Sequence, residues 1–104
     1  MPDTKALDLE QMRRSADEAT SVLHVLAHKD RLLLLCQLSQ GEMSVGELEE
    51  CLEIRQPGLS QHLGVLRREG LVQTRREGKY IHYRVADERV LAVLQTLYEQ
   101  YCDT

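Results

Sequence analysis

The stretch 56–84 constrains this chain most, because a helical pattern there is followed at once by β-rich sequence. Pro57 suits the first turn of a helix, where its missing N–H would have no partner anyway. Gly70 is the residue expected just past a helix end. The apolar positions between these two residues have the helical spacing i, i+4 and i+7: Leu59, Leu63 and Leu66. The pattern therefore predicts a short helix with one apolar face.

Two β-rich runs follow this helix, at 71–75 and 80–84. The residues 76–79 between them predict the tip of a hairpin, so that 71–84 forms a two-stranded ribbon. A short helix followed directly by a basic hairpin is the outline of a winged helix.

A second helix is predicted immediately upstream of the first. Ser44 and Glu47 fit a capping box, in which the Ser side chain accepts from the third helical N–H and the Glu side chain reaches back. This helix turns into the helix that begins near Pro57. The range 44–69 is therefore predicted to be a helix-turn-helix.

The outer face of the helix after Pro57 carries polar side chains of the kind that hydrogen-bond to base edges in a major groove. The residues expected to contact bases are Gln56, Ser60, Gln61 and His62. Basic side chains beyond them are expected to contact phosphates or the minor groove: Arg67, Arg68, Arg75, Arg76 and Lys79. Any one of these arginines, taken alone, could equally be a surface charge.

Charge is distributed unevenly along the chain. The range 55–84 contains seven Lys or Arg and two Glu, a formal charge of +5, within a chain whose net charge is −4. The remainder therefore carries −9. A basic segment set in an acidic body favours a nucleic-acid partner.

The other helices complete a single domain over 1–104, mainly α with a small β-hairpin, in the order α-α-α-α-β-β-α. Residues 1–7 are expected to be a frayed tail. Helices are predicted over 8–27, over 30–38, where leucines cover almost every face, and over 87–103. The long first helix carries an apolar stripe and is expected to pack on a partner subunit: Met12, Ala16, Ala19, Leu23 and Leu26. The last helix carries another: Val90, Leu94, Leu97 and Tyr101.

Over essentially its whole length the chain resembles the ArsR/SmtB family of winged-helix repressors. The matching segments are His28-Lys29-Asp30-Arg31-Leu32, 44–48, 56–63 and 66–72, and Lys29 stands where the family pattern usually has Pro. The resemblance implies a homodimer that pairs through the helices at 8–27 and 87–103. It also implies binding to an imperfect palindrome in double-stranded operator DNA.

The metal sites common in this family do not fit the sequence. The site on the third helix needs a Cys-x-Cys core, but Val45-Gly46-Glu47-Leu48 fills that region. The site on the last helix needs histidine, whereas this helix offers only Asp87, Glu88 and Glu99. We therefore predict no metal and no cofactor. A regulator that binds a soft metal through its cysteine thiolates remains an alternative.

Cys36 and Cys102 look like the dithiol of the redox-sensing branch of the family, the BigR, SqrR and HlyU-like repressors. This resemblance implies that reactive sulfur species or oxidants link the two cysteines as a polysulfide or disulfide, and that operator affinity then falls. The alternative is that Cys36 is a small core residue and Cys102 a tail residue. Cys51 is expected to pack within its helix.

Other classes of function receive little support from the sequence. No nucleophile with an adjacent base, phosphate loop or carboxylate pair stands out, so we do not expect an enzyme. The longest apolar run, 32–36, is far too short to span a bilayer, and a cytoplasmic protein with reduced cysteines is expected. A winged helix that binds another protein instead of DNA remains a further alternative.

Overall fold

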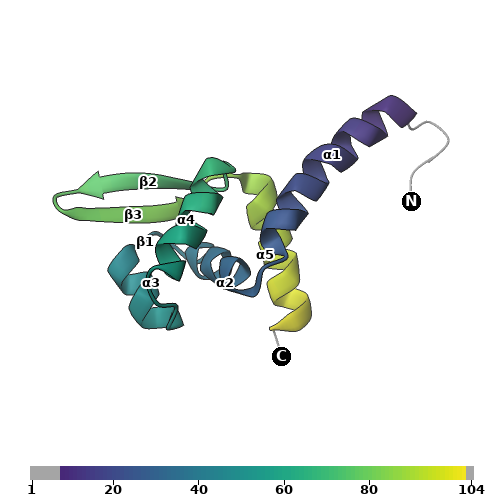
Figure 1. Ribbon diagram of the computed structural model, residues 1–104. Coiled ribbons are helices and arrows are strands. Elements are labelled where there is room, and N and C mark those ends of the chain that lie inside the picture. Colours follow the sequence, from purple (N-terminus) through teal and green to yellow (C-terminus); the bar gives the residue numbers. More distant parts are fainter. Residues whose placement is uncertain (1–7, 103–104) are drawn as a thin grey trace.

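The computed structural model describes residues 8–102, so the predicted tail 1–7 and the last residue of the predicted helix 87–103 lie outside it. Within 8–102 the fold is a winged helix-turn-helix of five helices and a small sheet (Figure 1). The elements are α1 (Leu9–Leu26), α2 (Lys29–Leu38), β1 (Met43–Ser44), α3 (Val45–Leu52), α4 (Gly58–Arg68), β2 (Val72–Glu77), β3 (Tyr80–Val85) and α5 (Glu88–Tyr101). The hairpin of β2 and β3 projects from one side of the molecule, and α1 projects from the other.

The helix starts follow from capping side chains. Ser44 and Glu47 form the predicted capping box of α3, with the Ser44 hydroxyl accepting from the Glu47 N–H at 3.2 Å. Asp8 caps α1 and Asp87 caps α5, each accepting from the backbone N–H two residues later. His28 does the same for α2 through its imidazole. Each cap satisfies a helical N–H that would otherwise have no partner.

The sheet has one strand more than the sequence predicted. The strand order is β1-β3-β2, and β1 pairs antiparallel with β3, so that Met43 lies opposite Tyr83 and Ser44 opposite His82. The prediction of a two-stranded ribbon was therefore incomplete. A two-residue strand is too short for any alternation to appear, and Ser44 was interpreted only as a helix cap.

The hairpin is also tighter than predicted. Glu77 pairs with Tyr80, so the tip consists of Gly78 and Lys79 rather than the whole range 76–79. Gly78 has a φ of +62°, a left-handed conformation that glycine adopts at no steric cost and that two-residue hairpin turns require. The two strands consequently extend further from the body than the β-rich runs indicated.

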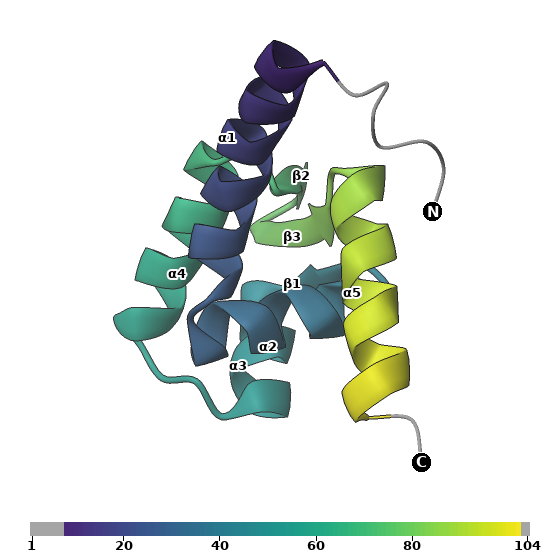
Figure 2. The same ribbon diagram turned by 90° about the vertical axis from the view of Figure 1, so that its right-hand side faces the viewer.

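The core is centred on α2, which packs against α1, α3, α4, α5 and β3. Figure 2 shows α2 between α1 and α5. Almost all of the buried side chains are leucine, isoleucine or valine, as expected of a chain without Phe or Trp. Those that are fully buried are Leu34, Leu35, Leu48, Leu59, Leu63, Leu66 and Leu94. Within residues 8–102, no helix is long and apolar enough to cross a membrane.

Candidate nucleic-acid interface and cysteine pair

The helix α4 presents one apolar and one polar face, as its sequence predicts. Its leucines at 59, 63 and 66 are buried in the core. Ser60 and Gln61, which lie between them, are exposed on the opposite side. The hydroxyl group of Ser60 and the amide group of Gln61 can hydrogen-bond to base edges when the major groove of DNA lies against this face.

Gln56 has a structural role that the sequence did not reveal. Its side-chain oxygen accepts a hydrogen bond from the Ser60 N–H at 3.1 Å, whereas Pro57, the residue at the N-cap, makes no side-chain cap. Gln56 therefore caps the first turn of α4 from one residue upstream. This hydrogen bond holds the side-chain amide of Gln56 at the start of α4.

His62 does not take the outward position predicted for a base-contacting residue. Its side chain is only 16% exposed, and its ring packs on that of His28 with centroids 4.5 Å apart. Its Nε2 lies 3.8 Å from Oδ2 of Asp30. Because His62 lies three residues after Leu59 and one before Leu63, it stands at the margin of the apolar stripe and faces the start of α2. Burial lowers the pKa of His62, with the nearby His28 adding to the effect.

Four of the five predicted basic residues lie exposed in two groups, one at the end of α4 and one near the tip of the wing. Arg67 and Arg68 are exposed in the last turn of α4. Arg76 donates from Nε to the Gly78 carbonyl at 3.3 Å, and the Lys79 ammonium lies 5.6 Å from the centre of the Tyr80 ring. These two contacts hold a pair of cations at the tip of the wing.

Arg75 is already paired within the protein. Its Nη2 donates to Oε1 of Glu42 at 2.6 Å, and its Nη1 lies 3.3 Å from Oε2 of Glu77. These partners raise the pKa of Arg75, and the Arg75 guanidinium in turn lowers the pKa of Glu42. A phosphate would have to compete with two carboxylates for this side chain. The Glu42 contact has no local sequence signal, because it forms only when β1 joins the sheet.

Cys36 lies on α2, which packs against α5, and Cys102 follows the last residue of α5. Cys36 is partly buried against the core, and Cys102 is exposed at the end of α5. Burial raises the pKa of the Cys36 thiol above its ordinary value of 9.0, and negative charge on Cys102 raises it further. The two sulfurs are thus within electrostatic range of each other. Cys51 is exposed on α3, so the prediction that it packs within its helix is wrong.

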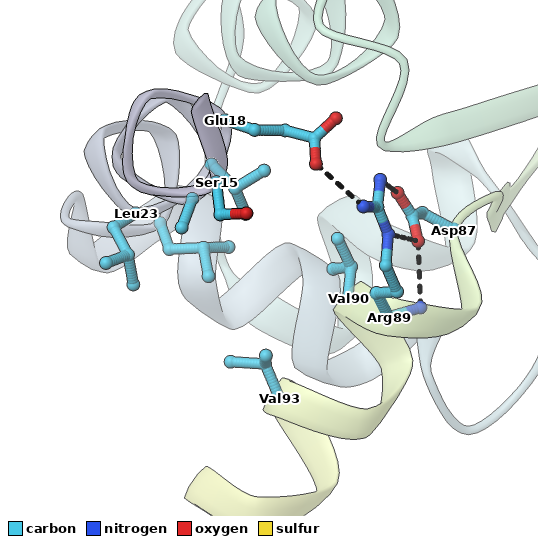
Figure 3. A pocket seen from close by; sticks show the side chains of 10 residues that line it. Ser15, Glu18, Leu23, Asp87, Arg89, Val90 and Val93 are labelled. Atoms are coloured by element: carbon cyan, nitrogen blue, oxygen red, sulfur yellow. Dashed lines mark hydrogen bonds and ion pairs between the residues drawn. The ribbon is translucent and has the colours of Figure 1, made fainter. Parts of the chain in front are cut away.

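The groove between α1 and α5 is apolar (Figure 3). It has a volume of about 470 Å³, and Leu23 from α1 and Val93 from α5 point into it. At one rim, Arg89 bridges Glu18 at 2.9 Å and Asp87 at 3.3 Å. Within the described protomer, large apolar side chains stay exposed along most of α1, with Met12 46% exposed and Leu23 55% exposed.

Comparison with known proteins identifies the family. The family model described as "Bacterial regulatory protein, arsR family" matches residues 28–74. The chain is 50% identical to the biofilm growth-associated repressor of Agrobacterium fabrum, over 96% of this chain and 86% of that protein.

Two solved structures support the same assignment. Reduced HlyU from Vibrio cholerae superposes with a TM-score of 0.87 at 41% identity, covering 90% of this chain and 99% of that one. The homodimeric winged helix-turn-helix DNA-binding domain of a possible ArsR-family regulator from Mycobacterium bovis superposes with a TM-score of 0.71 at 30% identity, covering 92% of each chain. The chain therefore belongs to the arsR family of bacterial regulatory proteins, and it is a transcriptional regulator, not an enzyme.

Proposed function

We propose that this protein is a homodimeric repressor that binds an imperfect palindrome in double-stranded operator DNA through α4 and the wing. The proposal for DNA rests on an outward polar face at Ser60 and Gln61 that continues into the cations at Arg67 and Arg68. Base contacts from the first pair would specify the sequence, and phosphate contacts from the second pair would add salt-dependent affinity.

The second subunit is proposed to cover the apolar stripe of α1 and the groove beside α5. Three large apolar side chains of α1 are exposed in the protomer: Leu9 at 61%, Met12 at 46% and Leu23 at 55%. Apolar surface gathered on one face of a helix marks an interaction site. A two-fold axis at this face would present the two copies of α4 to successive major grooves, about 34 Å apart. The homodimeric relative from Mycobacterium bovis has the same fold.

The inducer is proposed to be an oxidant or a reactive sulfur species that links Cys36 to Cys102. The observation that carries this proposal is the placement of the two thiols on neighbouring elements, Cys36 on α2 and Cys102 at the end of α5, which packs against α2. Cys102 is exposed, so an oxidant can reach it first. Cys36 is partly buried and its pKa is raised, so it remains a thiol at neutral pH and serves as the resolving partner.

With a peroxide, the Cys102 thiolate attacks the O–O bond and becomes a sulfenic acid, while the peroxide is reduced to water or an alcohol. The Cys36 sulfur then attacks the sulfenic sulfur, a disulfide forms, and the hydroxyl group leaves as water. A direct disulfide requires the two Cα atoms to lie within about 7 Å.

With a persulfide donor, each cysteine accepts one sulfur atom and the donor leaves as its thiol. Attack of one cysteine persulfide on the other then forms a trisulfide and releases hydrogen sulfide. A bridge with inserted sulfur spans a larger gap than a disulfide, so the separation of the two cysteines would decide which inducer acts.

Either bridge would tie the buried helix α2 to the dimerisation helix α5. A link of this kind regulates DNA binding only if the linked and unlinked proteins favour different dimer arrangements, with a coupling typically of about 1–3 kcal/mol. The expected result is a fall in operator affinity of roughly 5- to 150-fold, the range that corresponds to this coupling.

The experiment compares operator binding by the reduced protein with binding after treatment with a persulfide donor and, separately, with peroxide. Intact mass is recorded for each sample. Cys102→Ser removes the proposed attacking thiol, and Cys51→Ser is the matched control because Cys51 is also exposed but lies on α3. We expect the wild type and Cys51→Ser to lose affinity and to gain a bridge, and Cys102→Ser to do neither.

Two results would contradict the switch: unchanged DNA binding in a protein whose mass proves the bridge, or an equal response from Cys102→Ser.

DNA binding itself is tested by Gln61→Ala, with Gln40→Ala in the exposed loop after α2 as the matched control. Loss of one base contact should reduce discrimination for the operator by about 1–3 kcal/mol. Affinity for the operator should also fall steeply with salt. A wing that binds another protein would show neither the salt dependence nor a preference for a palindrome.

A further inference from the structure

Three potential metal ligands meet where α4 packs on the start of α2. The side chains of His28, Asp30 and His62 each offer one ligand atom, and these atoms all lie within 4.8 Å of one another. His28 and Asp30 come from the first turn of α2, and His62 comes from the middle of α4. Among residues 8–102 this is the group of three or more potential ligands that the fold brings together, and it contains no cysteine.

The spacing is close to that of a coordination shell. Ligand atoms about 2.1 Å from a tetrahedral ion lie roughly 3.4 Å from each other. The separation between His62 Nε2 and Asp30 Oδ2 is 3.8 Å, slightly longer than this value. Neither of these side chains is fully buried, so an ion can enter and keep a water in the remaining position.

Asp30 supplies the one negative charge among the three ligands. Of the two cations beside it on α2, Lys29 and Arg31, Arg31 donates from Nε to the Val25 carbonyl at 2.8 Å.

The binding would have one cost. The Nδ1 atom of His28 accepts the N-cap bond from the Asp30 N–H at 3.2 Å, and a neutral imidazole has a single lone pair to offer. A metal bound by His28 therefore replaces this cap bond. The amide of Asp30 then reports on occupancy independently of any effect on DNA.

We propose that His28, Asp30 and His62 form a binding site for a first-row divalent cation of the zinc or nickel type, which links the start of α2 to α4. Imidazole and carboxylate ligands suit these ions. The site is separate from the cysteine pair. An occupied site fixes the packing of α4 on α2 through the same helix that carries Ser60 and Gln61.

The test uses the full reduced chain, titrated with Zn²⁺ and, for spectroscopy, with Co²⁺. His28→Asn removes the imidazole but retains a good N-cap residue, so α2 should still start normally. His24→Asn is the matched control, because His24 is exposed on α1 and lies outside the cluster. Binding is measured by calorimetry, and thermal unfolding is followed with and without Zn²⁺.

We expect the wild type and His24→Asn to bind one ion per protomer and to unfold at a higher temperature with Zn²⁺. His28→Asn should bind at least tenfold more weakly and show a smaller thermal shift. The Asp30 amide resonance should move on binding in the wild type. Equal affinity in His28→Asn and the wild type would overturn the proposal, as would no binding at all. A sulfur-to-Co²⁺ charge-transfer band would also overturn it by placing the ion on the cysteines.

Discussion

The helices α1 and α2 are both rich in apolar residues, yet the protomer buries α2 far more completely than α1. On α2, Leu34 is 0% exposed and the helix packs against five other elements. On α1, only Val25 and Leu26 are buried, and the rest of its apolar stripe faces outward beside the groove of Figure 3. Within residues 8–102, most of the apolar stripe of α1 is therefore left exposed.

An apolar pattern predicts that a face will be buried, but it does not predict which chain will bury it. The unfolding free energy that is lost when a leucine is replaced by alanine distinguishes the two cases. A leucine buried within the protomer stabilises every folded chain, whereas a leucine buried by a second subunit stabilises only the associated form.

Leu34→Ala should lower the free energy of unfolding by about 2–5 kcal/mol, because it removes buried methyl groups and leaves a cavity in the centre of the core. Urea unfolding at several protein concentrations measures this loss. The loss should be present at every concentration. A change below about 1 kcal/mol would mean that α2 is not the centre of the core.

The contact of α2 with α4 should make stability depend on pH through His62. Its pKa in the folded protein is lower than in the unfolded chain, so the unfolded chain takes up more protons as the pH falls. Stability should be unaffected above about pH 6.5 and should decrease below it, by no more than about 1.4 kcal/mol for each pH unit. The window between pH 6.5 and 5 lies above the range in which the carboxylates titrate.

His62→Gln should flatten this window in urea unfolding measured at a series of pH values. His24→Gln, on the exposed face of α1, should leave the slope unchanged. An unchanged slope in His62→Gln would show that the imidazole of His62 titrates alike in the folded and unfolded states.

Ser44→Ala should destabilise the protein by about 1 kcal/mol, since the Glu47 N–H loses its partner at the start of α3. Like the effect of Leu34→Ala, this loss belongs to the protomer and should not vary with concentration. Ser44→Asn should recover part of it by restoring an acceptor, and failure of this rescue would point to the strand pairing of Ser44 with His82 instead.

The regular parts of the fold could be predicted from the sequence because they are set by local chemistry. The capping box at Ser44, the leucine spacing of α4 and the turn at Gly70, whose φ is +76°, each depend on residues a few positions apart. The strand β1 could not be predicted. It has two residues and exists only because β3 provides a partner.

The candidate site was predictable to a lesser degree, because side-chain partners depend on tertiary contacts. The pairing of Arg75 with Glu42 joins residues 33 positions apart and needs the third strand. The inward position of His62 had a local signal, its place at the edge of the leucine stripe of α4. The identity of its neighbours on α2 had none.

Leu23→Ala should have the smallest effect on the stability of the protomer, and it tests the contrast between α1 and α2 most directly. Leu23 is 55% exposed, so its truncation should change the unfolding free energy by no more than about 0.5 kcal/mol once the subunits are diluted apart. At concentrations where the subunits associate, the same substitution should weaken association, as measured by sedimentation equilibrium, and reduce operator affinity with it. Gln11→Ala, also on α1, is the exposed polar control. If Leu23→Ala instead costs as much as Leu34→Ala at every concentration, then α1 is held by its own chain and the contrast between the two helices fails. If neither association nor DNA binding changes, the second subunit packs on a face of the protomer other than the exposed face of α1.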